Sequence, residues 1–209
     1  MTLLFYILVA LVLLYSIILH EIAHGKAAEI MGDSTARLYG RLTLNPIPHL
    51  DPFGTVLPIL LMLIGSPMVF GWAKPVPINP YNFSNYRRGM IWVSVAGILT
   101  NLFVAWFLAT IAKFLPAATN DFAYLLQSVL LFGVRINVVL AVFNLIPIPP
   151  LDGSKLLSMY LPAEYEHYLR QIEPYGIFIL LFVLTFPPTQ DILWFVIDLV
   201  YKLLMLRPF

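Results

Sequence analysis

His20, Glu21 and His24 are the residues of this sequence whose types and spacing could support catalysis. They lie in the stretch His20-Glu21-Ile22-Ala23-His24. On a helix, residues four apart project from nearly the same face, so His20 and His24 can bind one metal ion together. Glu21 lies beside them and can act on a water at that metal. The spacing H-E-x-x-H is typical of zinc-dependent peptidases and predicts a hydrolytic zinc site.

Chance, helix packing and ion transport account less well for this stretch. A chain with four histidines and few glutamates gives the pattern by chance on the order of once in five hundred such sequences. Both histidines and Glu21 could instead be satisfied by hydrogen bonds between helices. A membrane transporter or metal-handling channel could use His20, Glu21 and His24 as an ion path. Transporters are usually longer and built from repeated halves, and we find no internal repeat, so we favour the zinc site.

The composition points to a membrane protein. Hydrophobic residues make up 60% of the 209 residues and charged residues only 11%, whereas a soluble domain is about a quarter charged. The net charge of +1 gives no reason to expect nucleic acid as a partner. There is no cysteine, so a zinc ion must be held by histidine and carboxylate side chains. We expect an all-α polytopic membrane protein with a single domain over residues 1–209.

About six hydrophobic segments are predicted. They cover residues 2–31, 55–70, 88–115, 122–146, 175–186 and 192–206. The second segment is interrupted by Pro58, Gly65 and Pro67 and is marginal in length for a crossing. We therefore expect it to re-enter the membrane rather than to cross it.

The stretches around these segments predict a small membrane-associated β element and a C-terminal hairpin. Residues 36–44 have a strand-like pattern, and residues 72–80 carry alternating prolines that suit an edge strand with one free face. The last two segments flank Pro187-Pro188. They are expected to form a helical hairpin over about residues 175–206.

The basic residues are biased to one side of the predicted membrane. If the second segment turns back, that side holds Lys26, Arg37, Arg41, Lys74, Arg87, Arg88, Lys155, Arg170, Lys202 and Arg207. Only Lys113 then lies near the other side. Because cytoplasmic loops carry the excess of lysine and arginine, we expect a multi-pass protein of the cell membrane with its N-terminus outside and its C-terminus in the cytoplasm. His20, about 27 Å along the first helix, then lies near the cytoplasmic face.

Asp152 is the leading candidate for a third zinc ligand. A catalytic zinc takes three protein ligands and keeps one position open. In the expected topology, the fourth segment runs from outside to inside and delivers Asp152 to the side where His20 and His24 lie. Three prolines between residues 147 and 150 deny the helix its regular hydrogen bonds, so the backbone there is expected to be unwound and to line a cavity. An Asp-Gly pair without this topology would predict only a turn.

Four short motifs follow one another among the apolar segments. They are HEIAHG at residues 20–25, HLDPFG at 49–54, AGILTN at 96–101 and NLIPIPPLDG at 144–153. This order resembles the site-2 protease family of intramembrane zinc metalloproteases, and the second motif is similar to the small branch without PDZ or CBS domains. The likeness covers about residues 1–160, which are expected to be the catalytic core.

The resemblance implies one zinc ion bound by His20, His24 and Asp152, with Glu21 as the catalytic residue. Zinc lowers the pKa of its water and polarises the scissile carbonyl. Glu21 would take the water proton as general base and return it to the leaving amine. We therefore expect an endopeptidase that cleaves transmembrane or membrane-proximal protein segments near the cytoplasmic face.

The resemblance also implies that Asn144 and Asn101 contact or orient the substrate. The amide of Asn144 could help to hold the substrate backbone or the oxyanion. A transmembrane substrate helix hides its carbonyls in its own hydrogen bonds, so it must unwind before attack. The predicted edge strand at residues 72–80 could accept the unwound segment by strand addition. The expected partners are thus a transmembrane protein or peptide and the lipid bilayer.

Overall fold

Helices dominate the structure. The computed structural model describes residues 2–51, 54, 74–162, 168–169 and 171–206. The α-helices are α1 (Thr2–Ile30), α2 (Thr35–Leu38), α4 (Tyr86–Phe114), α5 (Asp121–Asn144), α6 (Asp152–Ser158), α8 (Gly176–Thr185) and α9 (Pro187–Met205), and the 3-10 helices are η1 (Ile47–His49), η2 (Pro80–Asn82) and η3 (Glu173–Tyr175). The predicted all-α class is confirmed over these ranges. The predicted re-entrant segment at residues 55–70 lies outside the described residues.

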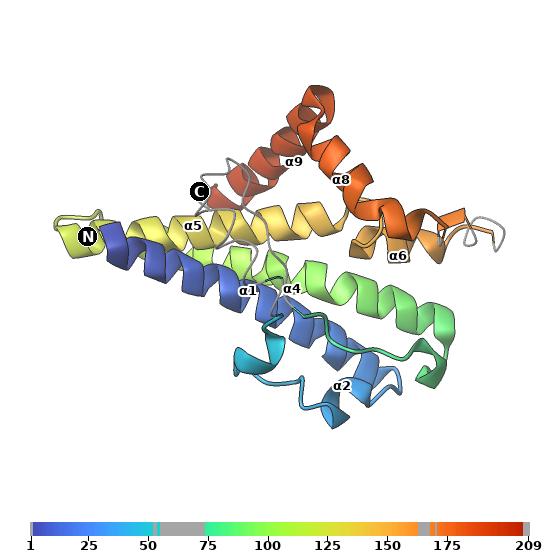
Figure 1. Cartoon of the computed structure of the whole chain (residues 1–209). Coiled ribbons are helices and arrows are strands. Elements are labelled where there is room, and N and C mark those ends of the chain that lie inside the picture. Colours follow the sequence, from blue (N-terminus) through green and yellow to red (C-terminus); the bar gives the residue numbers. More distant parts are fainter. Residues whose placement is uncertain (1, 52–53, 55–73, 163–167, 170, 207–209) are drawn as a thin grey trace.

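Three long helices, α1, α4 and α5, pack together as a bundle (Figure 1). Each is long and apolar enough to cross a membrane. The chain runs along α1, back along α4 and forward again along α5, so the N-terminus and the α4–α5 connection lie at one end of the bundle and α6 lies at the other. The ends of these helices differ from the predicted ends by no more than two residues.

Small residues line the side of α4 that faces the other two helices. The buried members of this face include Gly89, Gly97, Ala105, Ala109 and Ala112. Helices in lipid gain little from hydrophobic burial against one another, so close approach of their backbones and van der Waals packing stabilise the pair. The large side chains of Phe103 and Trp106 are instead exposed. This division matches a helix that turns its bulky side chains to lipid.

Asparagine side chains fix where α4 and α5 begin. The side-chain oxygen of Asn85 accepts a hydrogen bond from the Arg88 N–H, and that of Asn120 accepts one from the Ala123 N–H, both at 2.9 Å. Each bond satisfies a backbone donor that the first helical turn leaves unpaired. At the other end of α5, the helix stops at Asn144, before the prolines that cannot continue it.

The C-terminal helices differ from the predicted hairpin. They meet at Pro187 as expected, but their axes are bent by 82° and α8 has only 10 residues, about 15 Å of helix. The pair therefore offers at most one crossing. Asp198 of α9 pairs with Arg135 of α5, and Leu193 lines a pocket with Leu145, so α9 runs antiparallel to α5. In Figure 1 it leads back toward the end of the bundle that holds the N-terminus.

The strand prediction for residues 36–44 is wrong. Residues 35–38 form the short helix α2, and a turn follows at Gly40, which adopts a φ of 64°. A carboxylate oxygen of Asp33 accepts the Thr35 N–H and so favours a helical turn at that point. Of the predicted edge strand at 72–80, residues 74–80 are described, and they form no strand.

Asp33 connects the end of α1 to the proline-rich segment that precedes α4. Its two carboxylate oxygens accept hydrogen bonds from the Asn79 N–H at 2.7 Å and from the Asn82 side chain at 2.8 Å, besides those from Thr35. Burial by itself raises the pKa of Asp33, but these hydrogen bonds outweigh it and hold the pKa below its ordinary value. The carboxylate is fully buried, so its charge depends on these donors.

We predict that Asp33→Ala lowers the free energy of unfolding by about 2–3 kcal/mol, because it leaves buried donors without an acceptor. The stabilisation from Asp33 is complete above the ordinary pKa of an aspartate and is lost as the pH falls through the lowered value. Denaturation in detergent micelles at a series of pH values measures both effects. The exposed Asp121→Ala is the control, and equal stability of the two variants would contradict this role.

Candidate metal centre

Three potential ligand atoms from distant parts of the chain meet at one end of the bundle. His20 and His24 lie one helical turn apart on α1, and Asp152 is the first residue of α6. The Nε2 atoms of the two histidines are 2.9 Å apart, and Asp152 Oδ2 lies 3.2 Å from that of His20 and 3.0 Å from that of His24. All three residues are buried. The structure thus brings together the three residues predicted from the sequence to bind zinc.

The break after α5 places Asp152. Residues 145–151 form a series of turns instead of helix, as the prolines predicted. α6 then starts close against this backbone, because a Cβ atom on Gly153 would lie 2.3 Å from the carbonyl oxygen of Leu145. Only glycine permits this approach. The Asp-Gly pair is therefore more than a turn signal, since Gly153 lets the helix that begins at Asp152 pack beside the histidines.

The three atoms fit a metal ion. A tetrahedral zinc site with bonds of about 2.0–2.1 Å places its ligand atoms about 3.3–3.4 Å apart, close to the spacing observed here. His24 Nδ1 lies 2.7 Å from the Val93 carbonyl oxygen, which can only accept, so this nitrogen carries the proton and Nε2 carries a lone pair. Asp152 Oδ2 is buried without a hydrogen-bond donor. A cation between the histidines and Asp152 satisfies the lone pairs that face one another.

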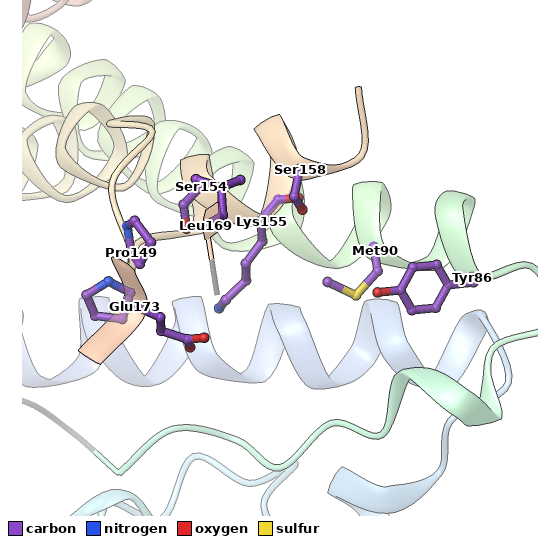
Figure 2. A pocket seen from close by; sticks show the side chains of 9 residues that line it. Tyr86, Met90, Pro149, Ser154, Lys155, Ser158, Leu169 and Glu173 are labelled. Carbon is purple, nitrogen blue, oxygen red and sulfur yellow. The ribbon is translucent and has the colours of Figure 1, made fainter. Parts of the chain in front are cut away.

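Lys155 holds the other oxygen of Asp152. Its Nζ donates a hydrogen bond to Asp152 Oδ1 at 3.1 Å, which leaves Oδ2 directed to the histidines. Burial raises the pKa of Asp152, and the neighbouring Lys155 ammonium lowers it. The Lys155 charge therefore favours the ionised carboxylate, which is the form that a zinc ligand takes. Figure 2 shows Lys155 extending across a small pocket of about 120 Å³ between Glu173 and Met90.

A larger cleft of about 440 Å³ opens on the three ligand residues. Glu21 lines it, and its Oε2 accepts a hydrogen bond from the Val76 N–H at 2.7 Å. Asn144 lines the opposite part, at the end of α5, and donates to the Leu140 carbonyl at 2.9 Å. A carboxamide nitrogen has two hydrogens, so one N–H of Asn144 remains for a ligand. The cleft therefore places a carboxylate and an amide donor beside the candidate metal position.

Asn101 lies elsewhere than expected. It is fully buried in α4, is not among the residues that line the cleft, and its Oδ1 lies 2.6 Å from His20 Nδ1. The sequence reasoning missed this contact with His20. A signal for it was present, because Gly97 and Asn101 are four residues apart and so share the face of α4 that packs on α1.

Similarity to known proteins agrees with this site. Residues 117–186, which include Asn144 and Asp152, match the model of peptidase family M50. The chain is 38% identical to "Putative zinc metalloprotease YwhC" of Bacillus subtilis over 87% of its length and 82% of that protein. It is 30% identical to "Putative zinc metalloprotease Rip2" of Mycolicibacterium smegmatis over 94% of its length and 72% of that protein.

A more distant relative, "Putative zinc metalloprotease MJ0611" of Methanocaldococcus jannaschii, is 33% identical over 62% of each chain. No solved structure matches significantly. The relatives span bacteria and an archaeon, yet their names agree on zinc and on proteolysis. With a zinc-type ligand set at one end of three apolar helices that are long enough to cross a membrane, the chain belongs to peptidase family M50, the site-2 proteases, which are intramembrane zinc metalloproteases.

Proposed function

We propose that this protease hydrolyses peptide bonds in transmembrane or membrane-proximal segments of other membrane proteins, using one zinc ion held by His20, His24 and Asp152. The observation that carries the proposal is the meeting of the two Nε2 atoms and Asp152 Oδ2 within 3.2 Å of one another. These atoms form one wall of a cleft that a peptide can enter. No feature of the described residues or of the relatives favours the transporter alternative.

Glu21 is the proposed general base. Zinc at this site supplies Lewis-acid activation of water and of the peptide carbonyl. Glu21 lines the same cleft, takes a proton from the attacking water and returns it to the leaving amine. The Val76 N–H orients its carboxylate by the bond to Oε2. Glu21 is not needed as a metal ligand in this arrangement, because two histidines and one aspartate already supply three.

Asn144 and the proline-rich segment are the proposed substrate contacts. The remaining N–H of Asn144 is proposed to donate a hydrogen bond to a substrate carbonyl or to the oxyanion. Pro75, Val76 and Ile78 line the facing wall of the cleft. This wall is the proposed place where an unwound substrate segment lies against the protein. We do not retain Asn101 as a substrate contact, because it lies behind His20.

The metal centre is proposed to lie near the cytoplasmic face, with the N-terminus outside. Lys26 near the end of α1, Arg88 near the start of α4 and Lys155 in α6 all belong to the end of the bundle opposite the N-terminus. The direction of α9 does not fit the cytoplasmic C-terminus expected from the sequence, since it leads back along α5. We further propose that residues 1–209 form one domain whose catalytic core is about residues 1–160.

We predict that Glu21→Gln keeps its zinc but cleaves a model transmembrane peptide about 10²–10⁴-fold more slowly, because the proton acceptor is lost and no ligand is. Zinc content by mass spectrometry and cleavage in proteoliposomes measure the two properties. Glu29→Gln is the matched control on the same helix, since Glu29 pairs with Lys26 and Arg37. Cleavage at the normal rate by Glu21→Gln would remove Glu21 from the mechanism.

Asp152→Ala is expected to lose zinc as well as activity, because the site then has only two protein ligands. Metal analysis after dialysis against a weak chelator measures the loss. Asp191→Ala, a change at an exposed position of α9, is the control and keeps its zinc. Full zinc occupancy in the Asp152→Ala protein would show that the third ligand lies elsewhere.

Gly97 of α4 provides the space for both histidine rings. A Cβ atom at this position would lie 2.4 Å from His20 Cε1 and 2.6 Å from His24 Nε2. The rings cannot retreat freely, because Asn101 and Val93 hold their Nδ1 atoms. The glycine of the AGILTN motif therefore leaves the space that the two histidine rings occupy.

We predict that Gly97→Ala weakens zinc binding at least about tenfold, by displacing the rings from their hydrogen-bond partners. Competition with a chromophoric chelator measures the affinity. Gly89→Ala is the matched control on the same helix, where a Cβ atom meets Phe83 at 2.3 Å instead of the histidines. It should lose stability but not zinc affinity, and an equal loss of zinc affinity in both variants would contradict the role given to Gly97.

A further inference from the structure

A buried polar network connects the candidate metal centre to the middle of the bundle. It consists of Ser16 on α1, Asn101 on α4 and Asn137 on α5, and all three are buried. Asn101 Nδ2 donates to Asn137 Oδ1 at 2.9 Å, and Asn137 Nδ2 donates to Ser16 Oγ at 2.8 Å. The network ends at His20, whose Nδ1 lies 2.6 Å from Asn101 Oδ1. Each of the three long helices contributes one member.

Backbone carbonyls fix the direction of every hydrogen bond in this network. The group of Asn137 that faces the Gly133 carbonyl at 2.9 Å must be its nitrogen, because a carbonyl oxygen only accepts. Ser16 donates its single hydrogen to the Val12 carbonyl at 2.7 Å, so its oxygen accepts from the same Asn137 nitrogen. The other end of the Asn137 amide is therefore an oxygen, and it faces Asn101.

The same reasoning continues to the histidine. The group of Asn101 that faces Asn137 Oδ1 must be its nitrogen, and this nitrogen also lies 3.3 Å from the Ser16 carbonyl. The oxygen of Asn101 is consequently the atom turned to His20 Nδ1. An amide oxygen only accepts, so Nδ1 of His20 must carry the proton. Nε2 is then left with the lone pair that a metal ion requires.

We infer that Asn137 and Ser16 are positioning residues for the metal centre: acting through Asn101, they select the tautomer of His20 that can bind zinc. The inference rests on the proposed zinc site and deepens it. The Nδ1 atoms of the two histidines have different partners, since that of His24 donates to the backbone carbonyl of Val93. Only His20 depends on a side-chain amide, and the orientation of that amide is set by Asn137 Oδ1 at 2.9 Å and by the Ser16 carbonyl at 3.3 Å.

The network differs from ordinary polar packing in one testable respect. Buried polar groups between membrane helices also stabilise the bundle, so loss of stability alone would not distinguish the two roles. A positioning role affects one histidine and leaves the other unchanged. The tautomer of each histidine can be read in the metal-free protein, where neither zinc nor cleavage enters the measurement.

The test uses the full chain in detergent micelles or nanodiscs, with ¹⁵N-labelled histidine rings, and compares the wild type with Asn137→Leu and Asn101→Leu. The chain has four histidines, so single substitutions assign the signals. We expect Nδ1–H tautomers for His20 and His24 in the wild type. In both variants His20 should shift toward the Nε2–H tautomer while His24 does not change, and zinc affinity should fall about 10–100-fold.

Ser94→Ala is the control for a buried polar loss on α4 outside the network, and it should change neither histidine. If Asn137→Leu does not fold, the smaller Asn137→Ala replaces it with the same expectation. An unchanged His20, or equal shifts of both histidines, would overturn the inference. Wild-type tautomers without zinc binding would instead count against the proposed function alone.

Discussion

Electrostatic repulsion among three lone pairs is the constraint on which the rest of this structure depends. Two imidazole nitrogens and a carboxylate oxygen face one another within 3.2 Å, away from water. In a region of low dielectric constant, such an arrangement persists only where surrounding groups enforce it, and a cation bound between the three atoms would relieve the repulsion. The helices of the bundle hold these three atoms close together.

Each long helix has a distinct part in this. α1 carries the two histidines. On α4, Gly97 leaves space for the histidine rings, and Asn101 and the Val93 carbonyl orient them. α5 leads to the turns that place Asp152 beside them. The small residues of α4 let the backbones approach closely enough for these contacts. The face of α4 that holds the bundle together is therefore also the face that holds the candidate metal ligands in place.

Membrane depth explains why the side chains of Ser16, Asn101 and Asn137 are all paired. In lipid, an unsatisfied amide or hydroxyl costs several kcal/mol, so a polar network between helices must close on backbone carbonyls or on a ligand. Asn137 and Ser16 close one end on Gly133 and Val12. The other end closes on His20. In a network closed at both ends, each hydrogen bond can run in only one direction. That fixed direction selects one of the two tautomers of His20.

Much of this protein could be predicted from its sequence, because local chemistry determines it. Apolar runs of helical length predicted three spanning helices within two residues, since hydrophobic length and capping residues act locally. The spacing of His20, Glu21 and His24 and the proline-broken approach to Asp152 selected the candidate site.

Contacts between distant segments could not be predicted in the same way. The strand prediction for residues 36–44 was wrong because the hydrogen bond that Asp33 accepts from the Thr35 N–H favours a helical turn there. The direction of α9 is set by its packing on α5. Asn101 faces His20 rather than the cleft because α1 and α4 approach closely at Gly97, and a side chain's partner depends on which helix packs against it.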